Sequence, residues 1–177
     1  GEQLRNPQIH DSDLLIEIHF QATSDGLLVS KMAGAGYELA IEDGRAIFTL
    51  ADAQGNRVSV LSAAPLADGA WHHLVAEADR EAQTLTLYVD GKQDARAAGF
   101  GPVSLANASA LHVGGHPTGD WINGRLEFLR IAQTTLAKSH TSIEELHAWQ
   151  FNGPHYRDFS GQKVKGAARD AGAVESF

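Results

Sequence analysis

The residues best suited to chemistry lie in one run, His-Pro-Thr-Gly-Asp-Trp-Ile-Asn, between positions 116 and 123. An exposed indole can stack on a sugar ring, while carboxylate, amide and imidazole groups can bond the sugar hydroxyls. A tryptophan in such a loop has less reason to be a core residue than one in a strand, although it could also close one end of a β-sandwich. The predicted carbohydrate-binding residues are Trp121, Asp120, Asn123 and His116.

The acidic residues do not predict catalysis. Hydrolysis of a glycosidic bond needs two carboxylates at one cleft, which on a strand means acidic residues at alternate positions. Glu17 stands alone between two isoleucines, and Glu127 is followed by Phe-Leu-Arg. The glycosidase pattern is therefore missing, and we predict a protein that is not an enzyme and has no catalytic residue.

The consecutive histidines His72 and His73 suggest a metal site at first sight. On a strand, however, neighbouring side chains point to opposite faces, so these two imidazoles would not bind one ion. We predict that His72 packs in the core with a hydrogen-bond partner and that His73 pairs with Asp90 across two strands. The spacing of the other histidines assigns no residue to a metal.

A β-hairpin over residues 71–89 must position these histidines. Polar and apolar residues alternate from Trp71 to Asp79 and again from Thr84 to Val89, with a polar break at residues 80–83. Placing Asp79 opposite Thr84 puts both sets of apolar residues on one face. Leu74, Ala76 and Ala78 then face Val89, Leu87 and Leu85. The opposite face, with Tyr88, Glu77, Thr86 and His73, is a second and shallower candidate surface.

Further short alternating segments predict the rest of the fold. They lie at residues 14–20, 37–41, 46–50 and 58–60, with turn residues between them. This pattern is typical of an all-β protein, a two-sheet antiparallel β-sandwich. The change of parity between Leu126 and Leu129 indicates a β-bulge or burial on both faces of the strand. One short helix is predicted at residues 141–149, where Ser and Thr precede Glu as in a capping box and apolar residues follow at helical spacing.

Several motifs carry a resemblance to a known family. They are Asp-Gly-x-Trp-His-His-Leu-Val-Ala at 68–76 and Leu-Tyr-Val-Asp-Gly-Lys at 87–92, with fitting segments at 26–39, 113–115 and 122–131. Together they resemble laminin G-like domains of the concanavalin A-like lectin and glucanase superfamily. The resemblance implies a jelly-roll sandwich, here over residues 1–151, but that fold hosts lectins, hydrolases, lyases and adhesion modules alike. Residues 152–177 are expected to form an irregular C-terminal extension, packed on the sandwich or on a neighbouring domain.

The same resemblance implies one structural calcium ion as the candidate cofactor. Oxygen ligands of the kind calcium prefers are present at Asp25, Asp120 and Asn123. The alternative is that these residues simply form turns. Where the family often has Asp-Asp, this chain has Glu127-Phe128, so part of the calcium pattern is missing.

Composition limits the partners. The 177 residues carry 22 acidic and 14 basic side chains, a net charge of −8, which argues against nucleic acid and anionic membranes. There is no cysteine, and no run is long enough to span a membrane. Because the sequence shows no signal-peptide pattern and starts at Gly1, we expect a mature or excised segment of a longer protein.

These observations predict a non-catalytic carbohydrate-binding module that contacts polysaccharides or oligosaccharides and neighbouring domains of its own chain. Residues 169–175 resemble closing segments of β-helical polysaccharide-degrading proteins, so we expect an accessory domain of a larger protein of that kind, secreted or extracellular, with a periplasmic location as the alternative. The alternatives are a structural or adhesive module without glycan binding, and a polysaccharide lyase or hydrolase with an unrecognised site.

Overall fold

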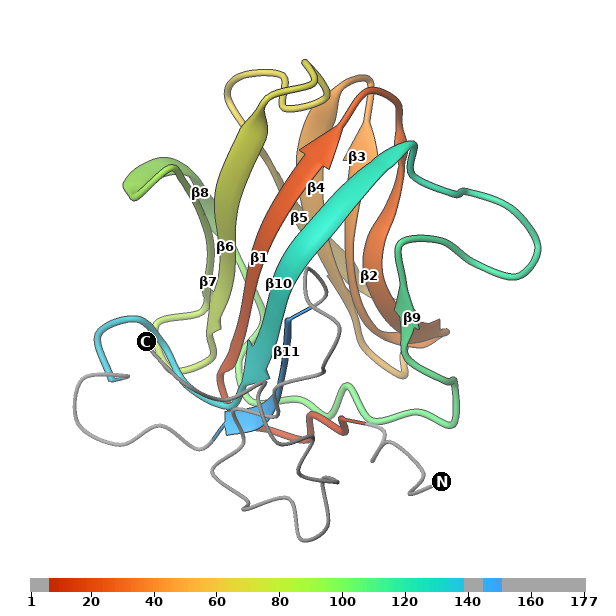
Figure 1. Cartoon of the computed structure of the whole chain (residues 1–177). Coiled ribbons are helices and arrows are strands. Elements are labelled where there is room, and N and C mark those ends of the chain that lie inside the picture. The colour runs from red at the N-terminus through yellow and green to blue at the C-terminus, as the bar shows by residue number, and fades with distance from the viewer. Residues whose placement is uncertain (1–6, 139–144, 151–177) are drawn as a thin grey trace, which may run out of the picture.

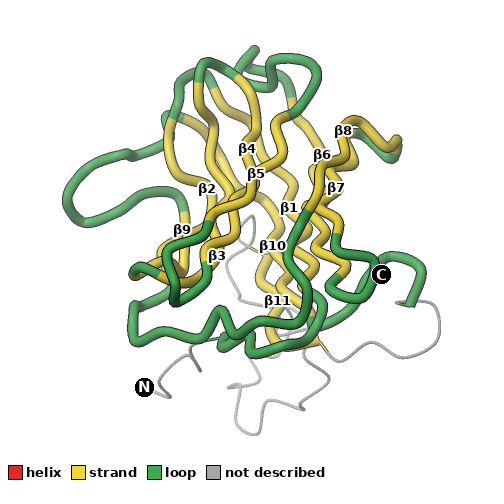
Figure 2. Tube along the Cα trace, turned by 180° about the vertical axis from the view of Figure 1, so that it is seen from behind, coloured by secondary structure: helices red, strands yellow, loops and turns green. Residues whose placement is uncertain are grey.

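The computed structural model describes residues 7–138 and 145–150, which form two antiparallel β-sheets facing one another (Figure 1). The six-stranded sheet has the order β11-β10-β1-β6-β7-β8, and the five-stranded sheet has the order β5-β4-β3-β2-β9. Viewed from behind, the second sheet lies in front of the first (Figure 2). The strand bounds are β1 Leu14–Ala22, β2 Gly26–Ala33, β3 Ala35–Glu42, β4 Arg45–Ala51, β5 Arg57–Leu61, β6 Trp71–Asp79, β7 Thr84–Val89, β8 Lys92–Ala98, β9 His112–Val113, β10 Gly124–Ala132 and β11 Glu145–Gln150. The predicted two-sheet sandwich is confirmed.

The core lies between the two sheets and is built from alternate residues of each strand. In β1, Ile16, Ile18 and Phe20 are completely buried, and Leu39 of β3 and Phe48 of β4 are buried in the same cluster. Each such side chain contributes about 1.5–3 kcal/mol when it leaves water. The intervening residues of β1 therefore point to the outer face of the six-stranded sheet.

The hairpin of β6 and β7 has the predicted register. Asp79 pairs with Thr84, Glu77 with Thr86, and Leu74 with Val89. The next turn, into β8, contains Asp90 and Gly91 with φ of 51° and 78°. Glycine adopts such values without a Cβ clash, and aspartate is among the few other residues that tolerate them.

The predicted bulge in β10 is also confirmed. Opposite β1, His19 pairs with Phe128 while Phe20 pairs with Leu126, so Glu127 is the extra residue. A bulge re-aims the side chains around it. As a result Glu127 points to the outer face beside His19, as their hydrogen bond shows.

The helix predicted over residues 141–149 is wrong where the structure describes it. Residues 145–150 form β11, which pairs with β10 from Phe128↔Gln150 to Ala132↔Glu145. The free edge of β10 offers unpaired backbone groups, whereas a helix of two turns is marginal by itself, so edge pairing outweighs the local capping signal. Residues 141–144 of the predicted helix and the extension predicted over 152–177 lie outside the described residues. In the part that is described, no helix has the length and apolarity needed to cross a bilayer.

Candidate functional site

The predicted carbohydrate loop, residues 114–123, connects β9 to β10 and projects outward from the strands (Figure 1). Its base is fastened to the β1–β2 turn by backbone hydrogen bonds. Leu27 N–H donates to the Asp120 carbonyl at 2.8 Å, and Thr23 N–H donates to the Asn123 carbonyl at 2.9 Å. A Cβ on Gly26 would lie 2.7 Å from the Ile122 backbone, so glycine permits this close approach.

Trp121 is the most exposed large apolar residue of the described chain, with 64% of its surface accessible. One side of its indole lies against the backbone of Gly115. A Cβ placed on that glycine would fall 2.2 Å from Cε3 of the indole. The loop therefore presents a supported aromatic surface to solvent, and the tryptophan does not close the end of the core.

The polar residues predicted around Trp121 lie in the same loop. Asp120, at φ 60°, and Asn123 are both exposed, and their side chains form no hydrogen bond with the described residues. His116 is half-buried, with Nδ1 2.6 Å from the Thr118 hydroxyl, and its ring packs on His112 at a centroid distance of 4.5 Å. Oriented imidazole, free carboxylate and free amide groups near an exposed indole can bond the hydroxyls of a sugar.

The three residues proposed as calcium ligands make other contacts in the structure. Both carboxylate oxygens of Asp25 accept backbone N–H groups, from Asp43 at 2.9 Å and from Gly44 at 2.8 Å. The Asp120 and Asn123 carbonyls accept the backbone bonds that fasten the loop. Among residues 7–138, no three His, Asp or Glu side chains are placed to hold a metal ion. Asp25 acts as a turn residue, which is the alternative that the sequence left open.

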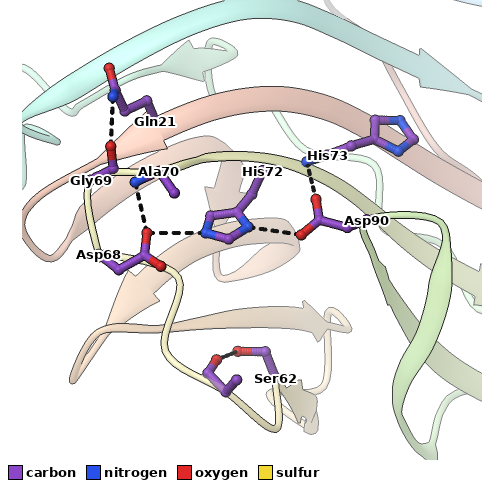
Figure 3. A network of polar contacts seen from close by, with 9 residues as sticks. Gln21, Ser62, Asp68, Gly69, Ala70, His72, His73 and Asp90 are labelled. Atoms are coloured by element: carbon purple, nitrogen blue, oxygen red, sulfur yellow. Dashed lines mark hydrogen bonds and ion pairs between the residues drawn. The ribbon is translucent and has the colours of Figure 1, made fainter.

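His72 is the nearly buried, partnered histidine that the sequence predicts (Figure 3). Its Nδ1 lies 3.0 Å from Asp90 Oδ2 and its Nε2 lies 3.2 Å from Asp68 Oδ1. Burial opposes a charge on this ring, but the hydrogen bonds and charges of Asp90 and Asp68 outweigh it and raise the pKa of His72. Because both ring nitrogens face acceptors, the contacts are best satisfied by the protonated imidazole.

The pairing predicted between His73 and Asp90 involves the backbone of His73 and not its imidazole. Its N–H donates to Asp90 Oδ1 at 2.9 Å, and the Asp90 N–H donates to the His73 carbonyl at 2.8 Å. The imidazole points the other way from that of His72 (Figure 3), and its Nε2 lies 2.8 Å from Glu17 Oε1 on β1. This hydrogen bond raises the pKa of His73 and is the main cause that lowers the pKa of Glu17.

A second exposed tryptophan marks a surface that sequence reasoning missed. Trp71, 41% exposed, packs on the ring of His19 with centroids 4.9 Å apart. His19 Nδ1 lies 2.5 Å from Glu127 Oε2. We call the outer surface formed by Trp71, His19, Glu127, His73 and Glu17 the Trp71 face. The parity change near Leu126 was the signal that could have placed Glu127 there.

The shallow surface expected around Glu77 and Thr86 is not accessible to solvent. Both residues are buried, and Glu77 Oε2 accepts the backbone N–H of Leu136 at 2.6 Å. Burial also raises the pKa of Glu77. The expectation of an open polar face is therefore wrong at Glu77 and Thr86, whereas Trp71 and His73 on the same side of β6 remain accessible to solvent.

Comparisons with known proteins agree with this architecture. The binding domain of Paraclostridial Mosquitocidal Protein 1 superposes with a TM-score of 0.60 at 17% identity, covering 73% of this chain and 35% of that one. A protein from Bacteroides ovatus ATCC 8483, classed provisionally as carbohydrate-binding, superposes with a TM-score of 0.65 at 14% identity, covering 85% of this chain and 50% of the other. At such identities the likeness concerns the fold alone.

One curated relative matches a shorter stretch. The N,N-dimethylformamidase beta subunit of an Alcaligenes species is 43% identical over 54 residues, which are 30% of this chain and 7% of that subunit. The family profile covers far more, residues 14–141, which include β1 to β10 and the Trp121 loop. The chain therefore belongs to the Laminin_G_3 family of the concanavalin A-like lectin/glucanases superfamily.

Proposed function

We propose that this domain is a non-catalytic carbohydrate-binding module, an accessory part of a larger secreted or extracellular protein. The observation that carries the proposal is Trp121, exposed over most of its surface yet supported from behind by Gly115. Burying such an indole against a sugar ring removes apolar area from water without first having to order a mobile side chain. Asp120, Asn123 and His116 supply the polar groups for the sugar hydroxyls.

The fold relatives support a binding role, since one is named as a binding domain and another is classed provisionally as carbohydrate-binding. Two carboxyl groups on the outer side of the six-stranded sheet do not have the properties of a general acid. A general acid for glycoside hydrolysis needs a raised pKa, but the Glu17 pKa is lowered by its bond to His73. The Glu77 pKa is raised, but its carboxyl group is buried under the Leu136 backbone.

A specific observation favours one alternative, a structural module inside a larger enzyme. The local 43% identity to a dimethylformamidase subunit places a similar segment in a protein whose name describes amide hydrolysis. In that case the domain would pack against its own chain and bind no glycan.

The test measures binding of the domain to a panel of soluble polysaccharides, by tryptophan fluorescence and by affinity electrophoresis. We expect retardation by at least one glycan, and a loss of about tenfold or more in affinity for Trp121→Ala. Leu61→Ala is the matched control, because Leu61 is an exposed apolar residue on a different strand. Failure of every glycan to change mobility or fluorescence would refute the carbohydrate role and favour the structural one.

A further inference from the structure

The Trp71 face lies on three neighbouring strands of the six-stranded sheet and shares no residue with the Trp121 loop. In β6 and β1, Trp71 pairs with Gln21 and His73 pairs with His19. Paired residues share a face, with Cβ atoms about 4.5–5.5 Å apart. The side chains of Trp71, His19 and His73 therefore form one contiguous patch, which Glu127 of β10 completes.

The two imidazoles of this patch are held in the same manner. His19 is oriented by Glu127 through Nδ1, and His73 is oriented by Glu17 through Nε2. Each ring keeps its other nitrogen free of any hydrogen bond to the described residues. The side chains of His19 and His73 are 35% and 41% exposed, so these nitrogens can meet a ligand from solvent.

Contacts with neighbouring side chains also hold Trp71 and Glu17 in place. The indole of Trp71 is stacked on His19 at an interplanar angle of 31°. Glu17, which holds His73, is itself braced by Arg130 Nη1 at 3.4 Å. Side chains already fixed by such contacts lose little further freedom on binding, and this favours affinity.

The charges of the Trp71 face and of the whole chain limit which glycans can bind there. Glu17 and Glu127 are balanced by Arg130, which contacts Glu17, and by the exposed Arg125, which pairs with Gln21 opposite Trp71, so the patch is close to neutral when the imidazoles are uncharged. The whole chain carries −8. Polyanionic glycans would be repelled by this field, whereas a neutral sugar can stack on the indole and exchange hydrogen bonds with imidazole and carboxylate.

We propose that the Trp71 face is a second carbohydrate-binding surface of this domain, selective for neutral glycans, in which Trp71 stacks on a sugar ring and His19 and His73 bond its hydroxyls. This surface shares the ligand class of the proposed function but rests on different residues. The module would then hold a polymer at two places, and avidity would strengthen its hold on long chains.

The experiment follows the indole N–H signals in ¹H–¹⁵N NMR spectra, assigned with Trp71→Phe and Trp121→Phe. The probes are oligosaccharides of laminarin, xylan and galactomannan as neutral glycans, and of alginate and polygalacturonate as anionic ones. We expect a neutral oligosaccharide to shift the Trp71 signal in the intact domain and in Trp121→Ala. Its apparent Kd in Trp121→Ala should rise about three- to tenfold on adding His73→Gln, and saturable binding should disappear on adding Trp71→Ala.

The outcomes separate the two proposals. A response of Trp121 alone overturns this inference and leaves the proposed function standing. A shift of the Trp71 signal alone overturns the Trp121 site but supports the Trp71 face. If only anionic oligosaccharides shift the Trp71 signal, the selectivity for neutral glycans is overturned. If neither indole signal shifts with any glycan, both proposals are overturned.

Because Trp71→Ala removes a packed ring, unfolding curves of each variant are compared. Trp71→Phe, which keeps an aromatic ring on His19, must retain most of the affinity.

Discussion

The indole of Trp121 lies directly against the backbone of Gly115, six residues earlier in the same loop. No other residue fits at position 115 without moving the ring, because even a methyl group would come within 2.2 Å of Cε3. The glycine thus determines how far the indole stands out from the sheet edge.

Gly115→Ala should therefore disturb the loop. The added methyl group must displace the indole, with an expected loss of about 1–3 kcal/mol in the free energy of unfolding. Urea unfolding measures this loss. In a Trp121→Ala background the obstructing ring is gone and only the strain of a side chain at φ 158° remains, so the same substitution should cost less. Equal costs in both backgrounds would contradict the contact.

The His73–Glu17 pair should make stability depend on pH in two directions. The pKa of His73 is raised above 6.5, so its contribution is full below that value and is lost as pH rises through the raised pKa. The pKa of Glu17 is lowered below 4.5, so its contribution is full above that value and is lost as pH falls through the lowered pKa. His72 adds to the loss at high pH, because its pKa is raised as well.

Glu17→Gln tests this dependence. Because the pair is partly exposed, we expect a loss of about 1 kcal/mol or less at pH 6, shrinking at pH 9, in urea unfolding at both values. Glu42→Gln, at an exposed glutamate in β3, is the control and should change neither value. A Glu17→Gln deficit that stays the same from pH 6 to pH 9 would argue against an ionic contribution of His73.

Asn107 should be a strong stabilising residue despite its position in a loop. Its side-chain amide donates to the Lys31 and Ala35 carbonyls, each at 3.0 Å, and its Oδ1 accepts from Lys31 Nζ at 3.4 Å, while its backbone carbonyl accepts from the same ammonium group at 3.0 Å. Burial lowers the pKa of Lys31, which makes these acceptors important for its ammonium group. Asn107→Ala should cost about 1–3 kcal/mol in thermal or urea unfolding.

Asn123→Ala is the matched control for that variant. The side chain of Asn123 is exposed and forms no hydrogen bond within residues 7–138, so its loss should change stability by less than about 0.5 kcal/mol. If both asparagine variants unfold alike, the bonds of Asn107 do not hold the loop as described.

Removal of calcium should leave the domain unchanged. The oxygens of Asp25 are already occupied by backbone N–H groups of Asp43 and Gly44. We expect the same Tm and the same glycan retention with EDTA as with added calcium. A Tm that falls by several degrees with EDTA and recovers with calcium would show that the turn opens to bind the ion.

Much of the fold could be predicted because strands alternate with a period of two. The register of the hairpin from Trp71 to Val89 follows from two alternations that agree, and a shift of one residue would expose its apolar side chains. The bulge at Glu127 was predictable for the same reason, since parity changes there along the chain. The edge strand β11 was not predictable, because a capping motif reports a local preference for helix and carries no information on the free edge of β10.

Some features of the candidate sites could likewise be predicted from the sequence, and others could not. The sequence by itself determined that Trp121 stands in a loop among polar residues, and that His72 and His73 diverge, since both follow from neighbours along the chain. Only the tertiary structure decided that Trp121 is exposed over Gly115, and that Glu127 meets His19 across 108 positions of sequence. The Trp71 face exists because β6, β1 and β10 lie side by side, and the order of strands in a sheet is chosen by burial of the whole core rather than by any one segment.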